Sequence, residues 1–161
     1  MKIAIKLAFD EKAAVRLLNW LARENAIILQ SRPDLPRLYD SGVVYRREQD
    51  ETWCDYLNML AQGQEDCDGL AAARAGELLA FGWRALSPRD AGYTEAKRAR
   101  LATIPAEVLL LTTSSGHSPG QYHCIVRYRV KRRWHRDDPS ARLGMPVPGS
   151  TNPPTRSRRN A

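Results

Sequence analysis

Residues 64–79 read QEDCDGLAAARAGELL, and this stretch decides the fold because it predicts a buried helix that begins at a cysteine. From Leu70 to Leu79 most residues are alanine or leucine, so little polar surface remains and we expect the helix to be central. We expect it to begin around Cys67 and to end before Gly82. The residues beside the cysteine are acidic, namely Glu65, Asp66 and Asp68. A helix N-terminus stabilises a thiolate whereas acidic neighbours disfavour one, so their balance decides whether Cys67 is reactive.

The composition is that of a globular protein with one domain. The chain has 161 residues, of which 43% are apolar and 27% are charged, and this is enough for a substantial core. We expect no membrane span, because no apolar run approaches the roughly 20 residues that a span requires. The basic start Met1-Lys2 lacks a secretory hydrophobic segment, so we expect the protein in the cytoplasm of the cell that makes it.

The cysteines do not form a metal-binding pattern. Cys54, Cys67 and Cys124 lack the C-x-x-C spacing of zinc sites, and no histidine cluster lies near them in the sequence. We therefore expect free thiols in a reducing compartment, one of them reactive, and neither a metal nor a cofactor.

Helical patterns precede strand patterns along the chain, which predicts an α+β domain over residues 1–145. The expected elements are a strand over 2–9, a helix from Asp10 to about Leu29, a second helix over 51–61, the helix at 67–81, and strands over 106–114, 121–130 and 133–137. Asp10 is a suitable N-cap for the first helix, and Gly63 is a suitable C-terminal stop for the second. The expected loops are 31–42, 87–105 and 114–120, which are polar or rich in proline and glycine.

Basic residues give the chain a net charge of +7, and they gather in two places. One group lies in residues 127–136, and the other lies in 156–159, within a Pro/Arg-rich tail that we expect over 146–161. The first group is interpreted as a solvated strand edge that is protected by charge. DNA binding is kept as a weaker alternative, because no aromatic residues alternate with the basic ones as a stacking platform requires.

A nucleophilic cysteine requires a base and a third group that orients the base. Asp66 is well placed as the N-cap of the helix, where backbone donors occupy its carboxylate, so an imidazolium near Cys67 would favour the thiolate. His123 is the preferred base, because an expected strand holds it rigidly. His135, in the last expected strand, is the second choice, and His117 lies in a loop that holds it poorly.

Asp138 is the candidate for the orienting group. Pro139 forces it into an extended conformation at the end of the strand that follows His123, where its carboxylate can accept a hydrogen bond from the imidazole. The alternative interpretation is an ordinary Asp-Pro turn. Because strand side chains alternate, we expect Cys124 to face away from His123.

Three segments resemble, in the same order, the transglutaminase-like cysteine proteins of tailed bacteriophages and prophages. They are EDCDGLAAARAGELL at 65–79, YHCIVRY at 122–128 and DDPSARLGM at 137–145. That family typically has a Gly-Asp-Cys-Glu/Asp-Asp-Leu-Ala helix start, a Tyr-His-Val-Val strand and an Asp-Pro-Ser…Leu-Gly-Met turn. The upstream stretches PRLYDSGVVYRRE and ETWCDYLNMLAQG also look like its N-terminal half, so the resemblance spans roughly Leu35 to Met145.

The resemblance implies a transglutaminase-like or papain-like fold in which Cys67, His123 and Asp138 form a catalytic triad. It also implies thiol acyl chemistry on a protein or peptide, as in a cysteine protease, a related hydrolase or a transglutaminase. The backbone N–H of Cys67 would belong to the oxyanion hole. Candidate side-chain donors to the same oxyanion are Gln62, Gln64 and Trp53.

The family context implies a component of the phage particle, which is made in the host bacterial cytoplasm and located in the virion. Its partners would be other virion proteins, and the tail at 146–161 suits docking on such a neighbour. The alternative is a non-catalytic structural component of the head–tail connection (the neck) or of the tail region, which keeps the fold without the chemistry.

Two positions depart from the family pattern. Glu65 stands where the family usually has glycine, and Gly69 stands where it usually has the second acidic residue. The glutamate is expected to narrow the approach to the thiol, and the glycine costs about 1 kcal/mol of helix propensity. Both changes are compatible with a decayed active site. A polar insertion at about 87–101 is expected to cover the site or to contact a partner.

Overall fold

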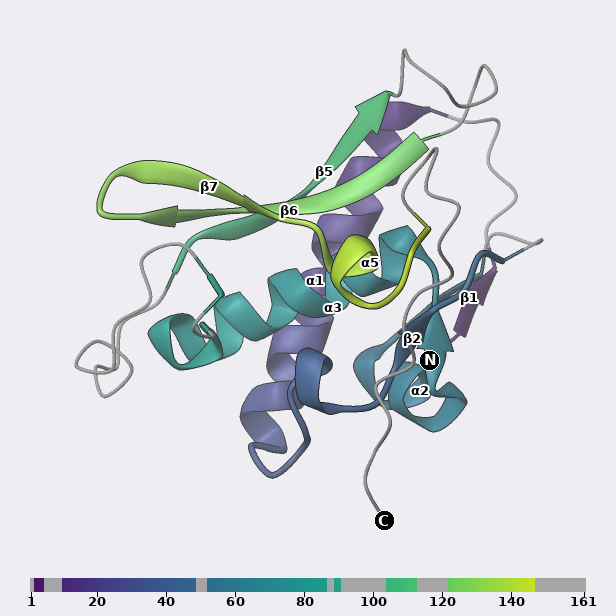
Figure 1. The fold of residues 1–161 in the computed structure, drawn as a ribbon, viewed down its shortest axis with the longest axis horizontal. Helices are drawn as coiled ribbons and strands as arrows, with labels where there is room; N and C mark the ends of the chain where they lie inside the picture. Colours follow the sequence, from purple (N-terminus) through teal and green to yellow (C-terminus); the bar gives the residue numbers. More distant parts are fainter. Residues whose placement is uncertain are drawn as a thin grey trace.

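The computed structural model describes residues 2–4, 10–48, 52–86, 89–90, 104–112 and 122–146, and it confirms an α+β architecture. Helices pack against a three-stranded antiparallel sheet, with α3 below the sheet and α1 behind it (Figure 1). The helices are α1 (Glu11–Ser31), α2 (Tyr56–Gln62), α3 (Cys67–Phe81) and α5 (Pro139–Arg142), with 3-10 turns η1 (Leu38–Asp40) and η2 (Gly82–Ala85). The strands are β1 (Lys2–Ala4), β2 (Val44–Tyr45), β3 (Thr52–Cys54), β4 (Gln64–Glu65), β5 (Ala106–Thr112), β6 (Tyr122–Val130) and β7 (Arg133–Asp137).

The main sheet has the order β5-β6-β7, and its two ladders have different lengths. β5 pairs with β6 from Tyr122 to Tyr128, whereas the pairing of β7 with β6 begins only at Val126. Within the described residues, the first part of β6 therefore has a strand on one side only. Two short pairs lie elsewhere in the fold, β1 antiparallel to β3 and β2 parallel to β4. β4 directly precedes α3, so the β2–β4 pair supports the residues that lead into Cys67.

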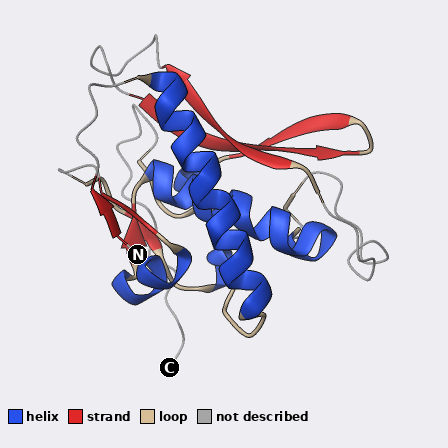
Figure 2. Ribbon diagram, turned by 180° about the vertical axis from the view of Figure 1, so that it is seen from behind, coloured by secondary structure: helices blue, strands red, loops and turns tan. Residues whose placement is uncertain are grey.

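Helix α3 is the centre of the core, as the sequence predicted. Its alanines between Leu70 and Gly76 are almost fully buried, and it lies between α1 on one side and strands β5 and β6 on the other. Figure 2 shows α1 crossing in front of α3. The helices approach closely at Gly76, where a Cβ would lie 2.7 Å from Asn25 Cβ and 2.9 Å from the Ala22 carbonyl oxygen. Small residues at the crossing thus bring the two helices together and fix the position of α3.

Polar side chains join these layers. Asn19 of α1 donates to the Val108 carbonyl oxygen (3.2 Å) and accepts from the Val108 N–H (2.9 Å), so it covers the outer edge of β5 as a strand partner would. Asn25 is buried and accepts from the backbone N–H of Tyr56 at 2.8 Å, which ties the start of α2 to α1.

Several local predictions are confirmed and one is wrong. Asp10 caps α1 by accepting from the Lys12 N–H at 2.9 Å, and Gly63 ends α2 in the left-handed conformation with φ 68°. The second helix was expected over 51–61, but the described residues 52–54 form β3 and the helix begins at Tyr56. The reason is non-local, because β3 pairs with β1 and Asp55 then caps the helix through the Asn58 N–H.

Some predictions fall outside the described residues. They concern His117 with most of its loop, the tail beyond Pro146, and nearly all of the polar insertion at 87–101. Among the helices that the structure describes, none combines the length and the apolar character that crossing a membrane demands.

Candidate active site

The N-terminus of α3 places Cys67 against the start of β6. The Cys67 sulfur interacts with the side chains of His123 and Cys124 and with the backbone N–H of Cys124, and these interactions shift the pKa values of the three residues. We expected Cys124 to face away from His123, yet both residues contact the same sulfur. Within the described residues this part of β6 is not paired with β7, since their ladder begins at Val126.

Asp138 holds the imidazole from the other side. His123 Nε2 lies 2.8 Å from Asp138 Oδ2, so Nδ1 is the ring nitrogen that remains for the Cys67 sulfur. The second oxygen of Asp138 accepts from the Ala141 N–H at 3.0 Å, because Asp138 is the N-cap of α5 and Pro139 is its first residue. The expected extended conformation of Asp138 is confirmed (φ −112°, ψ 92°), and the cap fixes its carboxylate in place.

The three residues polarise one another. The hydrogen bond from Cys124, followed by the one from His123, lowers the pKa of Cys67 to about 5 against the opposing effect of burial. The hydrogen bonds to Asp138 and then to Cys67 raise the pKa of His123 to about 9. Burial opposes ionisation of Asp138, but the bond from His123 still lowers its pKa. Near neutral pH the site therefore holds a thiolate and an imidazolium side by side.

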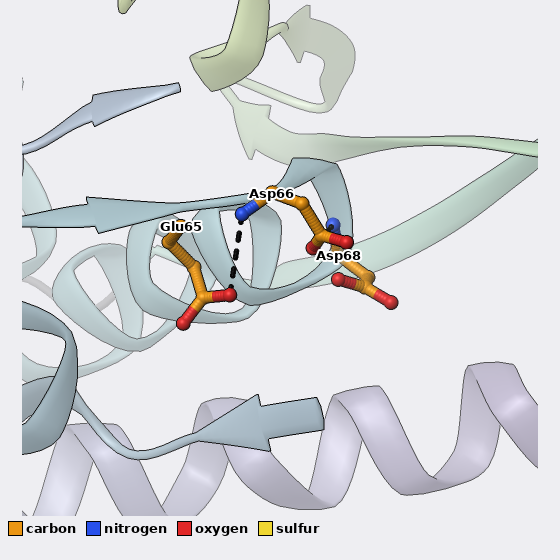
Figure 3. A group of neighbouring side chains, drawn as sticks. All are labelled: Glu65, Asp66 and Asp68. Carbon is orange, nitrogen blue, oxygen red and sulfur yellow. Dashed lines mark hydrogen bonds between the residues drawn. The ribbon is translucent and has the colours of Figure 1, made fainter. Parts of the chain in front are cut away.

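The acidic residues around Cys67 accept hydrogen bonds from the backbone of the helix start, and Figure 3 shows the bond from the Asp66 N–H to Glu65. Glu65 Oε1 accepts from the Asp66 N–H (3.2 Å), Asp66 Oδ1 from the Asp68 N–H (3.3 Å) and Asp68 Oδ1 from the Gly69 N–H (2.8 Å). Of the first N–H groups of the helix, these bonds leave that of Cys67 for a substrate oxyanion. The role of Asp66 as N-cap is confirmed.

Burial also reduces the charge of this acidic group. It raises the pKa of Glu65 to about 7 and that of Asp66 to about 6, and it raises the pKa of Asp68 well above its usual value. The neighbours therefore oppose the Cys67 thiolate less than their number suggests. Their oxygens lie within 4.8 Å of one another, but all three carboxylates are already engaged in bonds within the protein, and we assign them no metal.

The other cysteines are held as protonated thiols. Cys54 is buried and lies 2.6 Å from Glu65 Oε2, and burial followed by this bond raises its pKa. The bond to Cys67, followed by burial, raises the pKa of Cys124. Cys67 is thus the cysteine with nucleophilic character, in line with its position in the sequence.

The remaining candidates have other contacts. His135, the second choice for the base, pairs with Tyr128 across β6 and β7, and their ring centroids are 5.7 Å apart. Trp53 Nε1 donates to Asp68 Oδ2 at 2.5 Å, so this N–H is not free for an oxyanion. Gln64 accepts from Arg46 at 2.9 Å, and Gln62 is exposed at the end of α2.

A buried ionic network beside the site was not expected from the sequence. Arg74 of α3 is 1% exposed and contacts three carboxylates. Its Nε donates to Asp137 (2.8 Å), its Nη1 to Glu77 (2.9 Å) and its Nη2 to Asp90 (2.9 Å). The only signal in the sequence was one arginine within a helix of alanines and leucines.

The network fixes the chain next to Asp138. Asp137 also accepts from the Tyr39 hydroxyl at 2.7 Å and from Arg142 of α5 at 3.0 Å. Residues of α3, η1 and α5 therefore all bond to Asp137. These bonds also fix the backbone position of the next residue, Asp138. A cavity of about 330 Å³ adjoins this segment. Its lining includes Arg89, Asp90, Tyr128, Arg136, Asp138 and Arg142.

None of the family models, curated proteins or solved structures compared with this chain matches it. The functional assignment therefore depends on the residues and on the geometry of the site.

Proposed function

We propose that this chain is a cysteine acyl-transfer domain of the transglutaminase-like or papain-like type. Cys67 is the nucleophile, His123 is the base and then the acid, and Asp138 orients His123. The observation that carries the proposal is that His123 interacts with the Cys67 sulfur and is bonded through Nε2 to Asp138 at 2.8 Å. The resemblance of the three surrounding segments to phage transglutaminase-like proteins supports the same assignment.

The proposed reaction has two stages. The Cys67 thiolate attacks an amide carbonyl of a protein or peptide, and the new oxyanion accepts a hydrogen bond from the backbone N–H of Cys67. The C–N bond then breaks as His123 gives its proton to the leaving amine, which leaves a thioester on Cys67. In the second stage water or an amine attacks the thioester and His123 takes its proton. Water gives hydrolysis and an amine gives a cross-link.

A trapping experiment tests this chemistry. The protein is incubated with glutamine-containing peptides and with casein, with or without hydroxylamine, and the products are identified by mass spectrometry. Hydroxamates show acyl transfer, and new carboxylates show hydrolysis. Both products should disappear in Cys67→Ala. They should persist in the matched control Cys54→Ala, because Cys54 is bonded to Glu65 and is not a member of the proposed triad. Equal product formation by Cys67→Ala would refute the proposal.

The alternative is a non-catalytic component of the phage particle, in the neck or the tail region, that uses the fold as a scaffold. The observation in its favour is that two large apolar side chains of α1 are exposed two turns apart, Trp20 (38% exposed) and Ile27 (59% exposed). Either role places the protein in the virion after synthesis in the host cytoplasm, with other virion proteins as partners.

Complementation of a phage that lacks the gene separates the two roles. For a scaffold, Cys67→Ser should assemble and plaque normally, whereas deletion of residues 147–161 or Trp20→Asp should reduce incorporation. For an enzyme, Cys67→Ser particles should assemble and then lose infectivity or a processing event. Particle composition and plaque number are the two measurements.

A further inference from the structure

The contact between Cys67 and Cys124 lowers the pKa of the Cys67 thiol, but Cys124 itself takes no part in the proposed acyl transfer. Cys67 begins α3 and is partly exposed, whereas Cys124 lies on β6 and is only 2% exposed. Both are free thiols, and they lie close enough that each is the first cause of the shift in the pKa of the other. The two residues also belong to one packed cluster, since Cys67 lies against the core that contains Cys124. The fold thus holds together one accessible and one protected thiol from distant parts of the chain.

We propose that Cys67 and Cys124 form a peroxide-reactive dithiol, in which Cys67 reduces a hydroperoxide and Cys124 closes a reversible intramolecular disulfide. The proposal requires the contacts among Cys67, His123 and Cys124, but it does not require that the protein transfer acyl groups. It adds a second activity to the same sulfur atom.

The first step oxidises Cys67. Its thiolate attacks one oxygen of hydrogen peroxide, the O–O bond breaks, and Cys67 becomes a sulfenic acid. The departing hydroxide takes a proton from the His123 imidazolium and leaves as water. His123 is suited to this role because it is bonded to the Cys67 sulfur and is held by Asp138.

The second step uses Cys124. Its sulfur attacks the sulfenic sulfur, the S–O bond breaks, and a second hydroxide leaves as water with the Cys124 proton, which neutral His123 can relay. The bond to the Cys67 thiolate is the first cause of the raised pKa of Cys124, and it disappears once Cys67 is a neutral sulfenic acid. Across both steps, two thiols and one hydroperoxide give one disulfide and one water. The other product is a second water from hydrogen peroxide, or an alcohol from an organic hydroperoxide.

Cys54 provides the matched control. It is also buried, but its sulfur is bonded to Glu65 and not to Cys67. A disulfide that depended only on burial or proximity to the helix start would involve Cys54 as readily as Cys124. A disulfide that depends on the observed sulfur contact should be confined to Cys67 and Cys124.

The test treats the reduced full-length protein with one equivalent of hydrogen peroxide, then with iodoacetamide under denaturing conditions, and maps the peptides by mass spectrometry. We expect a Cys67–Cys124 cross-linked peptide, a free Cys54, and recovery of all thiols with dithiothreitol. Cys54→Ala should behave identically. Cys124→Ala should instead accumulate a Cys67 sulfenic acid, which dimedone captures at least tenfold more than in the unchanged protein.

Three results would overturn the proposal: a persistent Cys67 sulfenic acid in the unchanged protein, a cross-link to Cys54, or no oxidation of Cys67. Because Cys124 belongs to the core, the folding of Cys124→Ala is checked by circular dichroism. The peptide map of the unchanged protein decides the proposal even if that variant does not fold. Failure of the hydroxylamine trapping with a normal cross-link would refute acyl transfer alone.

Discussion

The side chain of Glu65 fills the space that any side chain at position 69 would require. A Cβ on Gly69 would lie 2.5 Å from Glu65 Cδ and 2.9 Å from its Oε1. Glu65 is held there by Cys54 and by the Asp66 N–H, and it is 1% exposed. The two departures from the family pattern therefore depend on each other, because a large residue at 65 requires glycine at 69. This relationship favours a rearranged helix start over a decayed one.

The contact between Glu65 and position 69 predicts that the effect of Gly69→Ala on the free energy of unfolding changes sign when Glu65 is removed. Gly69→Ala should destabilise the protein, because overpacking typically costs 1–3 kcal/mol and exceeds the gain of about 1 kcal/mol in helix propensity. In a Glu65→Gly background the same Gly69→Ala change should be stabilising, because the obstruction is gone. Urea denaturation of the four proteins measures both effects. Equal effects of Gly69→Ala in the two backgrounds would show that the positions are independent.

The pH dependence of Cys67 should differ between alkylation and acyl chemistry. Alkylation requires only the thiolate, so its rate should fall as the pH drops through about 5 and should not fall on the alkaline side. Acyl chemistry also requires the imidazolium, so it should decline as the pH rises through about 9. Iodoacetamide labelling with peptide mapping gives the first profile, and the hydroxamate assay gives the second. Two identical profiles would contradict the assigned proton on His123.

Replacing the base should move the alkylation profile. His123→Ala removes a hydrogen bond and a positive charge from the Cys67 sulfur, so its pKa should rise and labelling at pH 7 should slow roughly tenfold or more. His135→Ala is the control, because His135 faces Tyr128 instead. In the unchanged protein Cys54 and Cys124, which are both buried, should be labelled more slowly than Cys67. A larger effect of His135→Ala would assign the base to His135.

The arginine network should contribute strongly to stability. Arg74→Met leaves the buried carboxylates Glu77, Asp90 and Asp137 without their shared cation, and breaking a buried ion pair in this way typically costs 3–5 kcal/mol. Arg74→Lys should not rescue the loss, because an ammonium cannot reproduce the planar fork that contacts all three. Arg32→Met is the exposed control and should change the urea midpoint little. If Arg74→Met shifts the urea midpoint as little as Arg32→Met does, the proposed role of the network is wrong.

The basic hairpin allows a test of the DNA alternative. Trp134 is 46% exposed, and the guanidinium groups of Arg127 and Arg129 lie 4.7 and 5.7 Å from its ring centroid, so an aromatic residue does lie among the basic ones in space. Any binding to single-stranded DNA should weaken steeply with salt and with Trp134→Ala, but not with Leu57→Ala on α2. Fluorescence anisotropy at two salt concentrations measures this. Binding that is indifferent to salt would exclude the interface.

Local signals predicted the local structure around two of the three residues of the candidate site. The acidic cap and the alanine-rich run identified the helix that begins at Cys67, and Pro139 identified the extended conformation of Asp138. The contact of Cys124 with Cys67 could not be predicted from alternation, because it depends on how α3 packs against β6. The partner of Arg74 at Asp137 lies 63 residues away, and no local pattern connects them.

Because Asp138 uses one oxygen for His123 and the other for the start of α5, the order of synthesis governs when the thiol becomes reactive. Cys67 leaves the ribosome well before His123, and Asp138 follows later still. If Cys67 is the proposed nucleophile, a nascent chain that has completed α3 carries a cysteine with an ordinary pKa. The proposed reactivity then requires that the hairpin of β6 and β7 has closed and that α5 has formed, so that completion of the domain activates the thiol.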